Sequence, residues 1–169
     1  MRSSEDEETE GIIRFRYRLD PPGEAPPLAM LRAAHVRGLR AGWLGRDPAR
    51  YGGLAFGNLS LRGDRGFWVT ASQRIDRPRL EAEDVVEITA VAADWAVTAR
   101  GTHPPSSETL THAAVHAAAA PGPLAVFHGH APELWRAHAE LAWATTPRAA
   151  ANGTFALAEA VDARVRAAP

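Results

Sequence analysis

Residues 105–130 read PSSETLTHAAVHAAAAPGPLAVFHGH, and this stretch does most to decide the fold. Its first half predicts a helix from about Ser107 to Ala120, which the Pro-Gly-Pro at 121–123 ends. The short apolar run that follows, Leu124 to His130, predicts a strand. Glu108 lies just inside the predicted helix start, so an acid/base and two histidines border one helix–strand unit.

The histidines in that strand predict a metal site. Side chains alternate along a strand, so His128 and His130 point to the same face and could hold one ion. Neutral imidazoles suit zinc or a similar divalent metal. We expect Glu108 to face that ion across a turn, as acid/base and as a possible third ligand.

The rest of the chain predicts an α/β protein with a mixed sheet covered by helices. Residues 12–19 alternate as in a strand whose arginine face is wet, and apolar residues recur at helical spacing from Leu28 to Trp43. We expect His35, on that helical stripe, to be a packed histidine rather than a ligand. Further strands are predicted at 54–61, 66–72, 85–91 and 95–98, a helical turn at 80–84, and helices at 132–143 and 155–167.

Length and composition set broad bounds. We expect residues 11–169 to form one domain and the acidic residues 1–10 to be a disordered tail. A net charge of −1 argues against nucleic acid, and no apolar run approaches the roughly 20 residues that a membrane helix needs. There is no cysteine, and the acidic start is unlike a secretory signal, so we expect a cytoplasmic protein.

All 19 basic residues are arginine. Without lysine or cysteine, the chain cannot use a Schiff base, a pyridoxal anchor, a phosphate-loop lysine or a thiol nucleophile. If the chain activates a carbonyl, a metal ion is the remaining electron sink.

Three loops with small and polar residues follow predicted strands or open a predicted helix: Gly57-Asn58-Leu59-Ser60, Thr70-Ala71-Ser72-Gln73 and Pro105-Ser106-Ser107. Each alone is more often a turn or a cap. Together they predict a phosphate cradle, because glycine allows close backbone approach and free N–H groups at a helix start favour an anion.

Two further motifs, PSSETLTH and HGH, follow along the chain, and Gly153-Thr154 opens the last helix. Taken in this order, the loops and motifs resemble the class II aldolase/adducin family over roughly residues 28–165. The resemblance implies a three-layer α/β/α class II aldolase-like fold around a mostly antiparallel sheet, usually in a homo-oligomer, with a tetramer favoured. It implies a divalent metal, normally Zn²⁺, on His128 and His130, and Glu108 as the catalytic acid/base. It places a substrate phosphate among Asn58, Ser72, Ser106 and Ser107.

The sequence departs from the family pattern at several points, among them the lack of a counterpart to the catalytic tyrosine that some members carry near the carboxyl end. Relatives carry a third histidine ligand on a strand after the Gly-Thr helix, and these 169 residues hold no counterpart, so we expect a weak or partly occupied site. The third ligand could come from Glu108, His112, His103, a neighbouring subunit or water. A rival metal site is the stripe of Glu108, His112 and His116 along one helix. Relatives also carry glycine where Gln73 stands.

The leading hypothesis is therefore a metal-dependent aldolase-type lyase, with an epimerase or dehydratase as variants. It would act on a small sugar phosphate or related hydroxy-carbonyl compound through a metal-stabilised enediolate. The alternative is a non-catalytic, adducin-like binding or assembly module with a degenerate metal site. A metal-storage domain is a third, weaker hypothesis.

Overall fold

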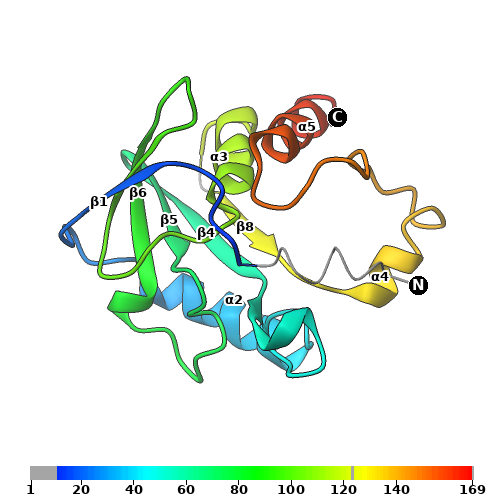
Figure 1. The fold of residues 1–169 in the computed structure, drawn as a ribbon, viewed down its shortest axis with the longest axis horizontal. Coiled ribbons are helices and arrows are strands. Elements are labelled where there is room, and N and C mark those ends of the chain that lie inside the picture. The colour runs from blue at the N-terminus through cyan, green and yellow to red at the C-terminus, as the bar shows by residue number, and fades with distance from the viewer. Residues whose placement is uncertain (1–10, 123, 169) are drawn as a thin grey trace.

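The computed structural model describes residues 11–122 and 124–168. Its centre is a six-stranded sheet in the order β1-β7-β6-β5-β4-β8 (Figure 1). Only the β1–β7 pair is parallel; the other four pairs are antiparallel. The strands are β1 (Tyr17–Asp20), β4 (Asn58–Gly63), β5 (Gly66–Thr70), β6 (Val85–Val91), β7 (Val97–Arg100) and β8 (Ala125–His128). A separate two-stranded ladder joins β2 (Gly45–Arg46) to β3 (Ala55–Phe56).

Helices cover both faces of the sheet (Figure 1). α2 (Leu28–Arg40) lies on one face, and α3 (Thr109–Ala118) packs with α5 (Phe155–Arg166) on the other. Shorter elements are α4 (Pro132–Arg136) and the 3₁₀ turns η1 (Tyr51–Gly53) and η2 (Ala82–Asp84). This arrangement confirms the predicted α/β class with a mostly antiparallel sheet between two helical layers.

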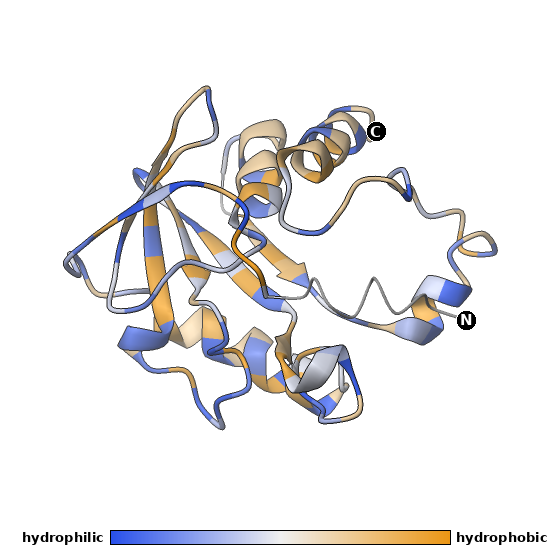
Figure 2. Cartoon of the chain, in the orientation of Figure 1, coloured by the Kyte–Doolittle hydropathy of each residue, from blue (hydrophilic) through white to orange (hydrophobic). Residues whose placement is uncertain are grey.

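The alternation of side chains along each strand builds two cores. On β5, Phe67 and Val69 join the core that includes Leu110 of α3, whereas Trp68 between them joins the core that includes Leu31 of α2. Figure 2 shows the corresponding hydrophobic colouring along the strands of the sheet. Because both faces are buried, β5 and β6 are mainly apolar, whereas β4 carries the buried polar residues Asn58 and Ser60.

Most predicted elements are present, but several boundaries were wrong. The strand expected over 54–61 is divided at Gly57 between β3 and β4, which belong to different sheets. The strand expected over residues 12–19 begins only at Tyr17, because this edge strand pairs with β7 over four residues. The helix expected over 132–143 ends at Arg136; α4 has no buried residue, so no packed face extends it. The helix expected from Leu28 to Trp43 ends at Arg40, just before Gly42 with φ +68°.

The expected disordered tail, residues 1–10, lies outside the described residues, and the single-domain assignment of 11–169 stays a prediction. Among the helices of residues 11–122 and 124–168, none is long and apolar enough to cross a membrane.

Candidate functional site

The three polar loops meet at the ends of β4 and β5 and the start of α3. Ala71 forms a β-bridge with Pro105, and the Ser72 N–H donates to the carbonyl of Pro104 at 2.9 Å. These contacts bring Ser72 beside the serines before α3. As a result, the four residues expected to bind phosphate line one small pocket: Asn58, Ser72, Ser106 and Ser107. Gly57 and Gln73 also line it.

Gly57 allows the first of these loops to pass close to its neighbours. Its φ is +78°, in the left-handed region that favours glycine. A Cβ at this position would lie 2.4 Å from Leu44 Cδ2 and 2.9 Å from the His128 carbonyl oxygen. Glycine is therefore required here both by backbone conformation and by space.

Ser106, Ser107 and Glu108 form the turn that leads into α3. Ser106 Oγ accepts the Glu108 N–H at 3.2 Å, and the Ser106 carbonyl accepts the Thr109 hydroxyl at 2.7 Å. Glu108 is the N-cap residue, one position before the helix rather than just inside it. Its carboxylate is buried and accepts the Thr111 hydroxyl at 2.8 Å, which holds the side chain beside its own helix.

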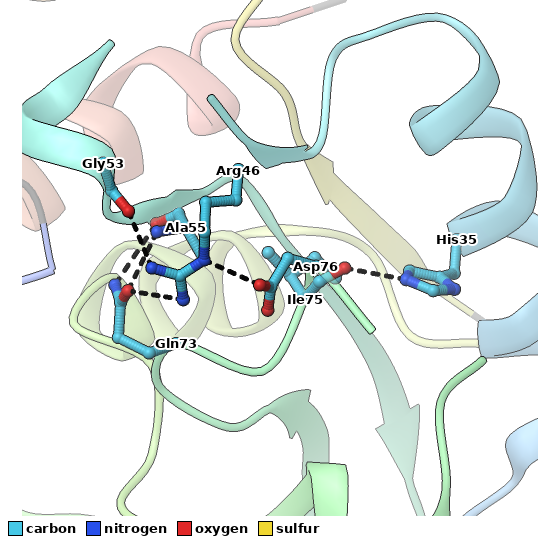
Figure 3. A network of polar contacts seen from close by, with 7 residues as sticks. All are labelled: His35, Arg46, Gly53, Ala55, Gln73, Ile75 and Asp76. Carbon is cyan, nitrogen blue, oxygen red and sulfur yellow. Dashed lines mark hydrogen bonds and ion pairs between the residues drawn. The ribbon is translucent and has the colours of Figure 1, made fainter. Parts of the chain in front are cut away.

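Gln73 lies at the pocket wall in the left-handed conformation, with φ +58°. Its amide pairs with the backbone of Ala55: Oε1 accepts the N–H at 2.8 Å and Nε2 donates to the carbonyl at 3.2 Å. The Arg46 guanidinium donates to Asp76 and to the Gly53 carbonyl, both at 2.7 Å, and reaches Gln73 Oε1 at 3.5 Å (Figure 3). Arg46 was not among the predicted site residues, because nothing local in the chain links it to Gln73.

The histidine pair lies at the end of β8. Asn58 on β4 is the register partner of His128, and the two imidazole centroids of His128 and His130 are 5.0 Å apart at 47°. The predicted proximity is present, but His130 lies beyond the strand. The backbone N–H of His130 donates to the Trp43 carbonyl at 2.8 Å, and the imidazole packs edge-on against Tyr51, with ring centroids 4.8 Å apart.

Behind this pair, four buried or half-buried side chains continue a hydrogen-bonded network. Asn58 Oδ1 accepts from His128 Nδ1 at 3.3 Å and from His112 Nε2. Ser60 Oγ bonds His112 Nδ1 at 2.7 Å and His116 Nε2 at 2.8 Å. The two histidines of the rival stripe on α3 therefore belong to this network, since both are hydrogen-bonded to Ser60.

The network histidines are neutral at physiological pH. Burial lowers the pKa of His112 well below its ordinary 6.5, and charges on His128 and His116 would lower it further. Burial and the neighbouring Arg62 lower the pKa of His116 to about 4. Both rings can therefore act as hydrogen-bond donor on one nitrogen and acceptor on the other.

His35 is also buried, and its Nε2 donates to the Ile75 carbonyl at 2.8 Å (Figure 3). It is a packed histidine, as expected.

Within residues 11–122 and 124–168, no three His, Asp or Glu side chains are placed to hold a metal ion. Glu108, expected to join His128 and His130 as a ligand, does not complete such a group here; its carboxylate is bonded to Thr111 instead. The two imidazoles alone fit a divalent cation as nitrogen donors. His128 donates through Nδ1 to Asn58, so its Nε2 keeps a lone pair.

Comparison with known proteins gives one match. A family model described as the class II aldolase and adducin N-terminal domain matches residues 48–135, more than half of the chain. This range holds the four residues expected to bind phosphate, Glu108, the network histidines and the histidine pair. No curated protein and no solved structure gave a match.

Proposed function

The chain belongs to the class II aldolase and adducin family, and from this premise we propose that it is a divalent-metal-dependent, aldolase-type lyase acting on a small phosphorylated hydroxy-carbonyl compound. The observation that carries the proposal is the pocket where the loops after β3 and β5 meet the loop before α3. Its lining of Asn58, Ser72, Ser106 and Ser107 offers hydroxyl and amide donors without a carboxylate, as an anionic group requires.

The phosphate of the substrate would bind in this pocket. Ser106 and Ser107 lie at the amino end of the ten-residue helix α3, where the helix dipole favours negative charge. Asn58 uses its carbonyl oxygen for two histidines, which leaves its NH₂ group as a donor toward the pocket. Arg46 contacts the pocket residue Gln73 but is ion-paired with Asp76, so the neutral donors that line the pocket would carry the binding.

Glu108 would carry the proton transfer. In carbon–carbon cleavage, its carboxylate takes the proton from the substrate hydroxyl; the bond to the carbonyl half then breaks and leaves its electron pair there as an enediolate. The Thr111 hydroxyl holds the carboxylate in place. A divalent ion on His128 and His130 would polarise the substrate carbonyl. Epimerisation and dehydration use the same proton acceptor.

The test combines metal analysis with a panel of phosphorylated aldoses and ketoses. After loading with zinc, cobalt or manganese, wild type is expected to retain the ion and turn over at least one compound. Glu108→Gln should lower that turnover by about 10²–10⁴-fold. Thr98→Val, on β7 at the other side of the sheet, is the control and should leave it unchanged. Equal turnover by wild type and Glu108→Gln would remove Glu108 from the mechanism.

One observation favours a second function, a non-catalytic adducin-like assembly module. The described part of the chain supplies no third metal ligand beside the histidine pair. For such a module, the protein purified with added metal would hold no ion, and a chelator would leave its melting temperature unchanged. Homo-oligomeric assembly and a cytoplasmic location are further expectations, measurable by light scattering and by cell fractionation.

A further inference from the structure

Five side chains form one continuous hydrogen-bonded chain behind the proposed cation ligand. It runs from His116 to Ser60 at 2.8 Å, from Ser60 to His112 at 2.7 Å, from His112 to Asn58, and from Asn58 to His128 at 3.3 Å. Ser60 and His112 are each 1% exposed and Asn58 is 5% exposed, so water does not compete for these links.

The donor and the acceptor of each hydrogen bond in this network follow from Asn58. Its Oδ1 can only accept, so His112 Nε2 and His128 Nδ1 must both carry hydrogen. A neutral His112 then has a lone pair on Nδ1, which accepts the single hydroxyl hydrogen of Ser60. Ser60 Oγ is left to accept, and His116 Nε2 must therefore donate to it.

The opposite direction would require the Asn58 amide to turn over, so that its NH₂ faces both rings. Each ring would then move its proton to the other nitrogen, and His116 would carry hydrogen on Nδ1. That atom is buried and has no hydrogen-bond partner among the described residues. A buried N–H without an acceptor costs more than a buried lone pair without a donor, so His116 favours the direction in which both rings donate to Asn58 Oδ1.

We propose that His116, Ser60 and His112 are positioning residues that, through the amide of Asn58, hold His128 in the tautomer with its proton on Nδ1. The Nε2 of His128 then keeps the lone pair with which it can bind a divalent cation. The role of that cation rests on the proposed function, whereas the tautomer is a property of the metal-free protein. His116 thereby has a role at the site although it is not among the residues that line the pocket.

The experiment is ¹⁵N NMR of the histidine side chains in the metal-free protein, followed by zinc titration in a calorimeter. In wild type, His128 is expected to show a protonated Nδ1 and an unprotonated Nε2. Ser60→Ala removes the central link, so His128 should show a mixture of both tautomers, and zinc affinity should fall by about tenfold. Thr89→Ala, a hydroxyl deletion on β6 outside the network, should change neither reading.

A matched pair of variants at His116, the far end of the hydrogen-bonded network, sharpens the test. His116→Gln keeps an N–H donor for Ser60 and should preserve the wild-type tautomer of His128, whereas His116→Leu should not. The proposal is overturned if wild-type His128 carries its proton on Nε2, a reading that needs no variant to fold. It is also overturned if Ser60→Ala keeps both the tautomer and the zinc affinity. Absence of turnover alongside the expected tautomer would count against the lyase only.

Discussion

Mild acid should destabilise this protein through His112 and His116. The pKa of each ring is lower in the folded chain than its ordinary 6.5, chiefly because burial disfavours the imidazolium. Below about pH 6.5 the unfolded chain therefore binds more protons than the folded chain. The stability contributed by these neutral rings is fully present above that pH and is lost as the pH falls toward the folded values.

The size of the loss follows from linkage. At about pH 5.0, which is 1.5 units below the unfolded value, a ring that stays neutral in the fold costs about 2 kcal/mol relative to neutral pH. His112 is 1% exposed and should contribute the full amount. His116, with a folded pKa of about 4, is only half-buried, so solvent screening reduces its share to about 1 kcal/mol. Together the free energy of unfolding should fall by about 3 kcal/mol.

The assay is urea unfolding at several pH values between about 7.5 and 5.0, with chelator present so that no metal contributes. His116→Gln removes one titrating ring but keeps a donor for Ser60 Oγ. Its loss of stability over this range should be smaller than that of wild type by about 1 kcal/mol. Identical pH dependence in the two proteins would show that His116 is not held neutral by the fold, and a wild-type stability that is flat over the range would refute the reasoning for both rings.

Three further predictions concern packing and backbone. Gly57→Ala should lower the free energy of unfolding by about 2–4 kcal/mol, because it adds left-handed strain and places the new Cβ only 2.4 Å from Leu44 Cδ2. Gly42→Ala, which has φ +68° but open space around it, should cost only about 1 kcal/mol by urea titration. Leu110→Ala, in the core under α3, should cost about 2–5 kcal/mol, measured the same way. At Gln73, both Ala and Gly lose the hydrogen bonds to Ala55, but Gly relieves the positive φ and should be the more stable variant by about 1 kcal/mol; equal stability would contradict the strain.

The regular elements were predictable because their signals are local. The apolar spacing from Leu28 predicted α2, and the run after Pro-Gly-Pro predicted β8. The errors arose at element ends that depend on a neighbouring element. β1 begins only where it pairs with β7, and α4 ends where nothing packs against it. Neither partner can be read from the residues of the element itself.

The site divides in the same way. Sequence order and residue type were enough to choose Asn58, Ser72, Ser106 and Ser107, since small polar residues beside strand ends are visible in the chain. The stripe of His112 and His116 was visible in the sequence, but its hydrogen bonds to Ser60 were not, because nothing local in the chain links a serine on a strand to two histidines on a later helix. They meet only because α3 packs across the strand that carries Ser60.

The sequence by itself determined the element types, the family motifs and the chemistry that is impossible without lysine or cysteine, because these depend on residue identity and short-range spacing. Only the tertiary structure decided which nitrogens donate, where the Gln73 amide binds, and that the Glu108 carboxylate rests on Thr111 rather than with the histidine pair. Two of these depend on contacts between residues 18 or more positions apart, and the third on the rotation of one side chain; burial and hydrogen-bond satisfaction fix all three.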